Sequence, residues 1–163
     1  IFRGGKNQMY EGGNRVPFIA WWPEHIKAKS VSNSPILGLD IMATLAEITG
    51  EKIEGDDAMD SSSLLPVLKG ENTSVHPFLM LQSGTGKQTM IIKDGWKLIM
   101  QDDKKDKEYK IRRPIALFNL NDNPSEIERD NLVNNPGYKS KVDYLFSIYN
   151  QTRNSGLPTK NLR

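Results

Sequence analysis

A lysine framed by two pairs of glycines is the residue whose surroundings most favour chemistry. Lys6 lies between Gly4-Gly5 and Gly12-Gly13, ahead of a short apolar run. Glycine permits positive φ angles and a close approach of the backbone to a ligand. The pattern therefore predicts a tight loop that holds the Lys6 ammonium toward an anion.

Two further residues of this segment are expected to hold the loop in place. Glu11 and Arg15 are four residues apart and carry opposite charges, which favours a partly buried ion pair or hydrogen-bonded clamp that fixes the loop. Acid–base catalysis by Glu11 is the alternative interpretation.

A second glycine-rich segment, residues 82–89, contains Gly-Thr-Gly-Lys. A phosphate-binding P-loop would need glycine where Leu81 stands and Ser or Thr where Gln88 stands. The segment therefore predicts a hairpin turn. The two histidines, His25 and His76, show no spacing typical of metal ligands.

The elements that must position these residues follow from the apolar pattern. Residues 16–22 form an apolar run that ends at a proline and predict a buried strand. Residues 34–50 predict an amphipathic helix with a local hydrogen-bonding role for Asp40, and residues 63–70 predict a short helix that ends at a glycine.

The second half of the chain predicts an antiparallel sheet, because short apolar runs alternate with tight turns such as Asp94-Gly95. The predicted strands are residues 76–81, 88–92, 96–100 and 115–119. Residues 101–110 predict a solvated loop, and residues 139–153 predict a helix that packs across the sheet.

Composition narrows the functional classes. The chain has 163 residues, a net charge of +2 and no cysteine. Lys and Arg are dispersed along the sequence and predict no basic patch for binding nucleic acid. No apolar run is long enough for a membrane span. The absence of cysteine excludes disulfides and thiolate metal sites.

Three ordered segments resemble the type I sulfatases of the alkaline phosphatase superfamily. Gly5-Lys6 followed by residues 10–17 is similar to the family pattern Gly-Lys, three residues, aromatic, Glu-Gly-Gly-x-Arg-Val-Pro. Residues 93–99 resemble Asp-Gly-x-Trp-Lys-Leu-Ile, and residues 117–126 with Asn131-Leu132 resemble a C-terminal Leu-aromatic-Asp-Leu-x-x-Asp-Pro-x-Glu signature.

The resemblance implies a fold in two parts that mixes α/β and α+β architecture. Residues 1–70 would form the end of a large α/β catalytic domain, and residues 71–163 a smaller α+β subdomain with a four-stranded antiparallel sheet and a packed helix. The formylglycine nucleophile of the family, in Cys/Ser-x-Pro-x-Arg, is not encoded here, and the calcium ligands would also lie before Ile1. We therefore expect a C-terminal fragment that is inactive alone.

The resemblance also implies site roles and partners. Lys6 would contact the sulfate during hydrolysis of the ester, and Gln82, Ser83 and Lys87 would contact the rest of a sulfated carbohydrate or other sulfate ester. The missing N-terminal portion would cover apolar surface of residues 16–22 and 36–48. The family implies an extracytoplasmic location.

Two alternatives remain open at this level. A phosphomonoester or phosphonate hydrolase of the same superfamily would use two transition metals instead of one calcium. A non-catalytic carbohydrate-binding or interaction module would keep the sheet without the chemistry.

Overall fold

The computed structural model describes residues 2–103 and 112–156, which group into two compact units. Residues 2–16 and 78–155 form the sheet unit, and residues 17–77 form the helical unit. The predicted loop at residues 101–110 lies mostly outside the described residues, since only its first three residues are included. A boundary near residue 70 within a larger protein stays a prediction.

The sheet unit is built on the predicted four-stranded antiparallel sheet, and its strands follow chain order. The strands are β1 (Leu79–Gln82), β2 (Gln88–Lys93), β3 (Trp96–Asp102) and β4 (Arg112–Asn119). The β2–β3 turn has φ angles of 52° at Asp94 and 77° at Gly95, which is the backbone that a two-residue hairpin with the twist of its strands requires. The Asp-Gly signal in the sequence thus places this turn correctly.

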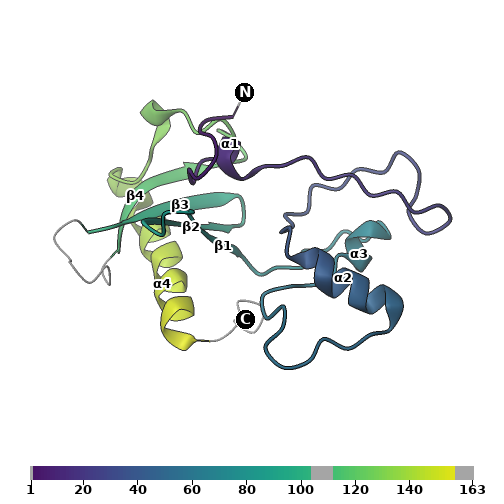
Figure 1. Ribbon diagram of the computed structural model, residues 1–163. Helices are drawn as coiled ribbons and strands as arrows, with labels where there is room; N and C mark the ends of the chain where they lie inside the picture. Colours follow the sequence, from purple (N-terminus) through teal and green to yellow (C-terminus); the bar gives the residue numbers. More distant parts are fainter. Residues whose placement is uncertain (1, 104–111, 157–163) are drawn as a thin grey trace. The chain divides into compact units, whose positions relative to one another are not determined.

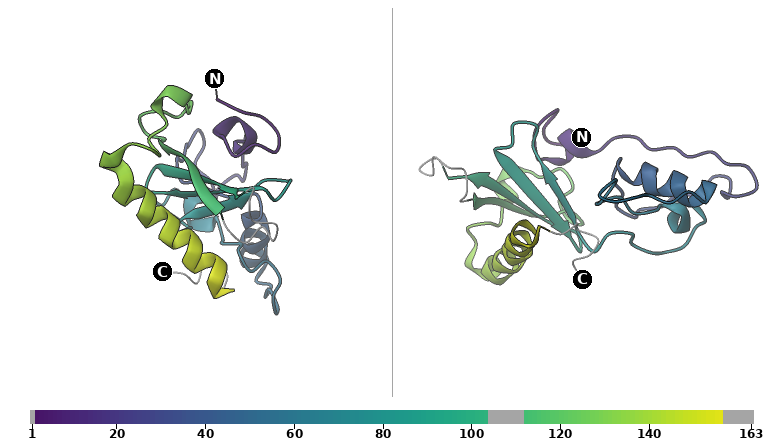
Figure 2. Two further views of the ribbon diagram at one scale, coloured as in Figure 1. Left: turned by 90° about the vertical axis from the view of Figure 1, so that its left-hand side faces the viewer. Right: turned by 60° about the horizontal axis from the view of Figure 1, so that its bottom comes forward.

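Different segments cover the two faces of this sheet (Figure 1). Helix α4 (Lys139–Ser155) packs on one face through Val142, Leu145 and Tyr149. Residues 2–16, with the short helix α1 (Glu11–Asn14), cover the other face, and Figure 2 shows the same arrangement from two more directions.

An apolar cluster lies between residues 2–16 and the sheet. It contains the buried side chains of Met9, Met90, Ile99 and Phe118. Two 3₁₀ turns, η1 (Glu128–Asp130) and η2 (Pro136–Tyr138), lie between β4 and α4 in the chain.

The helical unit contains α2 (Asp40–Thr49) and α3 (Leu65–Leu68). The buried Asp40 carboxylate accepts hydrogen bonds from Leu37 N at 2.7 Å and Ser62 N at 3.0 Å, and it pairs with His76 Nε2 at 2.8 Å. These bonds tie the start of α2 to two distant loops. Asp40 therefore has the local hydrogen-bonding role expected from the sequence.

Helix α2 is shorter than predicted. It begins at Asp40 instead of near residue 35 because residues 37–40 form a turn, in which Asp40 N donates to Leu37 O at 3.0 Å. Its C-terminal end agrees with the prediction, since Gly50 has a φ angle of 74° and caps the helix.

The strand predicted over residues 16–22 is wrong. Residues 16–22 have no regular secondary structure, all but the first of them lie in the helical unit, and Ile19 and Trp21 are 91% and 86% exposed. A strand needs a neighbour to pair with its backbone groups, and no described strand pairs with it. Along α2, the side chains of Ile41, Met42, Leu45 and Ile48 are also exposed, as the expectation of uncovered apolar surface requires.

Candidate functional site

The loop that carries Lys6 is a compact turn closed by its own polar groups. Gln8 N donates to Gly5 O at 3.0 Å, and Gly5 N donates to Gln8 Oε1 at 3.0 Å. The Asn14 side-chain amide donates to Gln8 O at 3.0 Å. The loop therefore has a defined shape before any ligand arrives.

The two glycines of the Glu-Gly-Gly motif are required by close packing of the backbone. A Cβ atom on Gly12 would lie 2.5 Å from Gly4 O, and one on Gly13 would lie 2.2 Å from Gln8 O. Gly12 N also donates to Arg3 O at 2.7 Å. Helix α1 is thus pressed directly against the backbone of the Lys6 loop, where no side chain fits.

Lys6 itself is exposed on this loop. Within residues 2–103 and 112–156, its ammonium forms no ion pair or hydrogen bond. A fixed backbone that presents an unpaired ammonium is the arrangement expected of an anion-binding lysine.

A buried charged cluster lies beneath helix α1. Lys97 of β3 is fully buried, and its Nζ lies 2.6 Å from Glu11 Oε1 and 2.7 Å from Glu126 Oε1. The same ammonium donates to Met9 O at 3.1 Å. We call Glu11, Lys97 and Glu126 the buried ion cluster.

The buried ion cluster holds the residues that follow the Lys6 loop. Glu126 also accepts a hydrogen bond from Glu11 N, so one carboxylate binds both the lysine and the start of α1. Buried charges are stable when they are paired and hydrogen-bonded. The cluster therefore joins helix α1 to the sheet through charge as well as through apolar packing.

Arg15 completes the cluster at the protein surface. Its Nε pairs with Glu11 Oε2, which is the ion pair expected from the sequence. Burial raises the pKa of Glu11, but the hydrogen bonds and charges of Lys97 and Arg15 outweigh burial and leave this pKa below its ordinary value. The lowered pKa favours the ionised form of Glu11 near neutral pH, in which it pairs with Lys97 and Arg15.

Arg3 anchors the opposite end of the loop. Its Nη1 donates to Glu126 O at 3.2 Å and pairs with Glu128, and its guanidinium lies 3.9 Å from the centroid of the Tyr10 ring. The hydrogen bond from Arg3 lowers the pKa of Glu128.

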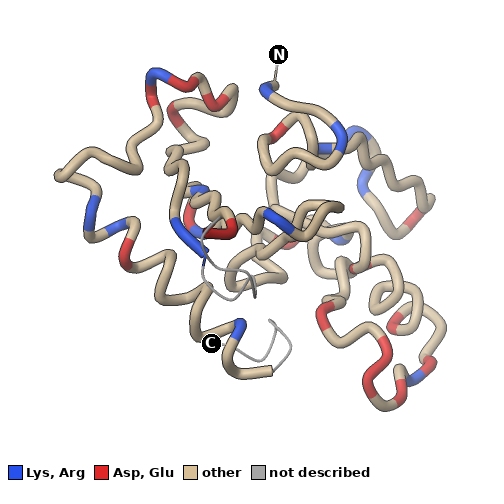
Figure 3. The backbone as a smooth tube through the Cα atoms, turned by 60° about the vertical axis from the view of Figure 1, so that its left-hand side comes forward, with Lys and Arg blue, Asp and Glu red and all other residues tan. Residues whose placement is uncertain are grey.

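Figure 3 shows the charged residues along the chain from another direction.

The hairpin turn at residues 82–87 touches the Lys6 loop. A Cβ atom on Gly84 would lie 2.5 Å from Asn7 Oδ1, so the Asn7 side chain rests on this glycine. The structure therefore brings together the two glycine-rich segments that the sequence singled out.

The three candidate residues of the turn differ in availability. Ser83 is buried, and its hydroxyl accepts from Gln88 N at 3.1 Å and lies 3.2 Å from Thr85 Oγ1. Gln82 and Lys87 are exposed, with Gln82 Nε2 donating to Gly86 O at 3.1 Å. Ser83 thus shapes the turn, while the side chains of Gln82 and Lys87 reach solvent.

Sequence reasoning missed Lys97 and Glu126 as partners of Glu11. Each belongs to one of the three motif segments, and the structure shows that the three segments meet in the buried ion cluster. One signal in the sequence could have indicated these partners: each motif contains a charged residue among apolar or turn-forming neighbours.

The described part of the chain contains neither a cluster of metal-ligating side chains nor a membrane-spanning helix. Residues 2–103 and 112–156 contain no group of three His, Asp or Glu side chains placed to hold a metal ion. The family resemblance places the calcium ligands before Ile1, outside these residues. No helix among the same residues is long and apolar enough to cross a membrane.

Comparison with known proteins identifies the family. Residues 4–155 match the family model described as "N-sulphoglucosamine sulphohydrolase, C-terminal". The chain belongs to the sulfatases and corresponds to their C-terminal region. Its membership confirms the family resemblance drawn from the three motif segments.

Curated relatives include several sulfatases. The chain is 31% identical to an N-acetylgalactosamine-6-O-sulfatase of Bacteroides thetaiotaomicron, over 77% of this chain and 25% of that protein. It is also 31% identical to an ulvan-active sulfatase of Formosa agariphila, over 83% of this chain and 32% of that protein. The chain therefore spans about a quarter to a third of these two relatives.

Solved structures support the same fold. A structure described in terms of glycosaminoglycan metabolism by Bacteroides thetaiotaomicron superposes with a TM-score of 0.76 at 26% identity, covering 94% of this chain and 32% of that one. A second structure, described as a complex with its substrate D-glucosamine-2-N,6-O-disulfate, gives a TM-score of 0.65 at 20% identity, over 82% of this chain and 27% of that one. Both agree with the antiparallel sheet and packed helix.

Proposed function

We propose that this sulfatase chain is the C-terminal part of an enzyme that hydrolyses sulfate esters and that Lys6 contacts the sulfate. The observation that carries the proposal is an exposed, unpaired lysine on a loop whose backbone is fixed by Gly12, Gly13 and the buried ion cluster. When the S–O bond breaks, negative charge grows on the leaving oxygen. A fixed ammonium at that position stabilises the charge without reorganising.

The residues around Lys6 act on its position rather than on the substrate. Glu11 is paired with Lys97 and Arg15, which keeps it ionised and fixed beneath the loop. Asn7 and Gly84 bring the 82–87 turn against the loop. In this proposal the turn contacts the part of the substrate that lies beyond the sulfate, through Gln82 and Lys87, and Ser83 keeps the shape of the turn.

The nucleophile and the metal belong to other parts of the enzyme in this proposal. The sequence contains no cysteine and no Ser-x-Pro-x-Arg motif, and its described residues offer no metal site. A formylglycine and a calcium ion, when present, would supply the attacking oxygen and the charge that orients the sulfate. We infer that this chain alone does not turn over a sulfate ester.

An N-terminal catalytic portion is the partner that this proposal requires. The apolar side chains of Ile41, Met42 and Leu45 along α2 are 45 to 55% exposed, and the relatives extend well beyond the matched region. Burying such a surface against another part of the same enzyme is favourable.

The substrate class that we propose is a sulfated carbohydrate. The N-acetylgalactosamine-6-O-sulfatase and the ulvan-active sulfatase are named for sugar substrates. An extracytoplasmic location suits substrates of that kind, and it belongs to the same proposal.

The test is the Lys6→Met substitution in the whole enzyme that contains this chain. We expect kcat/KM for a sulfate ester to fall by about 10²- to 10³-fold, the loss typical of one preorganised charge-stabilising group. Lys69→Met is the matched control, since Lys69 is an exposed lysine of the helical unit, and its kcat/KM should stay within about twofold of the wild type. Equal activity of the two variants would refute the role of Lys6.

A parallel assay tests the reaction and the fragment. The whole enzyme should prefer a sulfate ester to the matching phosphate ester, and the 163-residue chain alone should show no turnover above a buffer blank. A preference for the phosphate ester, or turnover that scales with the concentration of the fragment, would contradict the proposal.

A further inference from the structure

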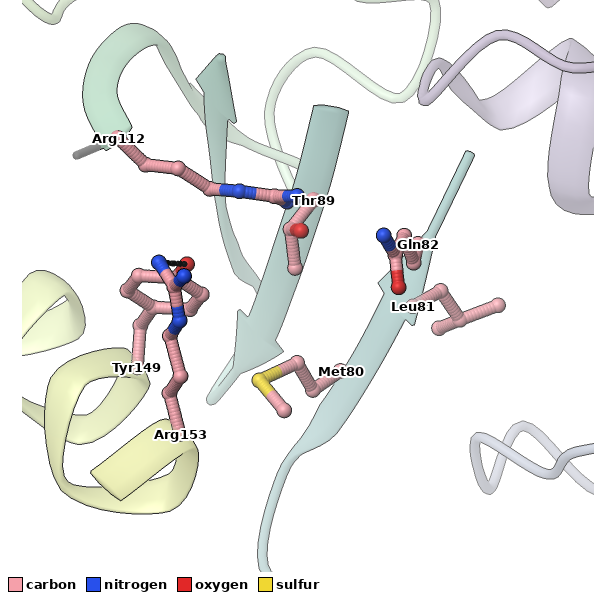
Figure 4. A pocket seen from close by; sticks show the side chains of 7 residues that line it. All are labelled: Met80, Leu81, Gln82, Thr89, Arg112, Tyr149 and Arg153. Carbon is pink, nitrogen blue, oxygen red and sulfur yellow. Dashed lines mark hydrogen bonds between the residues drawn. The ribbon is translucent and has the colours of Figure 1, made fainter. Parts of the chain in front are cut away.

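A pocket of about 360 Å³ lies on the α4 side of the sheet, the face opposite to the buried ion cluster (Figure 4). Its polar lining comes from the β1–β2 hairpin, the start of β4 and the C-terminal half of α4. The polar residues that line it are Gln82, Thr89, Arg112, Tyr149 and Arg153. Neither the Lys6 loop nor the buried ion cluster contributes to it, so the proposed sulfate contact at Lys6 lies outside this pocket. Gln82 lines the pocket and also belongs to the 82–87 turn of the proposed substrate contacts.

Arg112 gives this pocket a buried hydrogen-bond donor without a partner, although its charge is paired with Asp102. Its side chain is only 9% exposed, and its Nη2 donates to Gly86 O at 2.5 Å. Its Nε lies 3.0 Å from Asp102 Oδ1 without the direction of a hydrogen bond, and its Nη1 has no hydrogen-bond partner within the described residues. A buried donor that lacks a partner is costly, so an acceptor in the pocket would be stabilising.

Tyr149 and Arg153 add an ordered second donor system. Arg153 Nη1 donates to the Tyr149 hydroxyl at 3.1 Å, so the oxygen of Tyr149 accepts this bond and its own hydrogen can be donated into the pocket. Figure 4 shows the Arg112 side chain extending toward the strand that carries Thr89, while Arg153 rises from α4 beside the Tyr149 ring. Donors of two arginines and a tyrosine thus line one small space, which also contains the apolar side chain of Met80.

We propose that this pocket binds an acidic sugar through its sulfate or carboxylate, at a site separate from Lys6. Arginine donors suit both oxyanions, because a guanidinium forms paired charge-assisted hydrogen bonds with them. The oxyanion lies against Arg112 and the Tyr149 hydroxyl, and the sugar ring lies against Met80 with Gln82 and Thr89 as hydrogen-bonding groups. A volume of about 360 Å³ is at the small end of ligand pockets and exceeds the space that a lone sulfate fills.

The test follows the backbone amide resonances of the 163-residue chain by NMR during titration at constant ionic strength. The probes are N-acetylglucosamine 6-sulfate, glucuronic acid, inorganic sulfate and N-acetylglucosamine. We expect the two acidic sugars to shift the amides of Thr89 and Tyr149 in a saturable way and the neutral sugar to leave them unchanged. Inorganic sulfate should bind at least about fivefold more weakly than the sulfated sugar, since it lacks the ring contacts.

Arg112→Gln should weaken binding of both acidic sugars by about tenfold or more, because charge-assisted hydrogen bonds contribute more than neutral ones. Arg113→Gln is the matched control, since Arg113 is the neighbouring arginine, is exposed and pairs with Asp103 outside the pocket lining. Its affinities should stay within about twofold of the wild type. Arg153→Gln is a second variant in case Arg112→Gln fails to fold, since it changes an exposed position of α4. It should weaken binding of the acidic sugars by about threefold or more.

Several outcomes would overturn the proposal. Absence of saturable shifts at Thr89 and Tyr149, or equal loss of affinity in Arg112→Gln and Arg113→Gln, would refute the pocket. If Arg112→Gln does not fold, unchanged affinity in Arg153→Gln would refute it instead. Equal affinities for inorganic sulfate and the sulfated sugar would refute the contribution of the ring.

Discussion

Replacement of Lys97 by methionine tests whether the buried ion cluster holds the sheet unit together. Methionine keeps most of the length of lysine but removes the charge that faces Glu11 and Glu126, both of which are at least 95% buried. Breaking a buried pair by removing one partner costs about 3–5 kcal/mol, because the other charge stays buried without compensation. We expect Lys97→Met to lower the free energy of unfolding of the sheet unit by that amount.

The assay is urea unfolding at pH 7 followed by tryptophan fluorescence. A background with Trp21 and Trp22 replaced by phenylalanine leaves Trp96, which is adjacent to Lys97 in β3, as the reporter of the sheet unit. Lys139→Met is the matched control. Its ammonium pairs with Asp143 on the exposed surface of α4, so its loss should cost at most about 0.5 kcal/mol.

The reasoning is refuted if Lys97→Met and Lys139→Met destabilise the chain equally. A further variant separates charge from packing. Adding Glu11→Gln and Glu126→Gln to Lys97→Met removes the uncompensated carboxylates, so part of the lost stability should return. A triple variant less stable than Lys97→Met would show that the charges are not the cause.

Two other predictions concern the same unit. Gly13→Ala should destabilise it by about 1–3 kcal/mol through overpacking, because the new Cβ would lie 2.2 Å from Gln8 O. Gly5→Ala is the control, since a Cβ there would have no atom within 4 Å. It should cost less than about 0.5 kcal/mol in the same urea assay. Similar losses would contradict the close packing. The pKa of Glu11 is lowered in the folded state, so the stability from its ionised form is fully present above its ordinary pKa of 4.5 and is lost as the pH falls through the lower folded value. Unfolding at a series of pH values should show a smaller loss of stability below pH 4.5 in Glu11→Gln than in the wild type, and equal losses would argue against this ion pair.

The sheet was predictable because its signals are local. A two-residue Asp94-Gly95 turn fixes the hairpin of β2 and β3, and alternation of side chains fixes which residues face the core. The conformation of residues 16–22 was not predictable, because an apolar run indicates burial but does not specify a partner strand. Among the described residues the run has no such partner, and Ile19 is 91% exposed.

The candidate site was only partly predictable for a related reason. The glycines around Lys6 and the four-residue spacing of Glu11 and Arg15 are visible in the sequence, whereas their dependence on Lys97 is not. A lysine in a strand is ordinarily placed toward solvent. Lys97 faces inward only because Glu11 and Glu126 arrive from segments 115 residues apart, and no local pattern encodes such a meeting.

This separation along the chain has a consequence for synthesis of the protein. The ribosome makes the Lys6 loop before Lys97 and Glu126, which follow Met9 by 88 and 117 residues. Until Glu126 has been added, the start of α1 lacks its carboxylate acceptor and the cluster lacks half of its negative charge. A nascent chain that stalls before residue 126 therefore carries the glycine-rich loop without the Glu126 carboxylate that binds the start of α1.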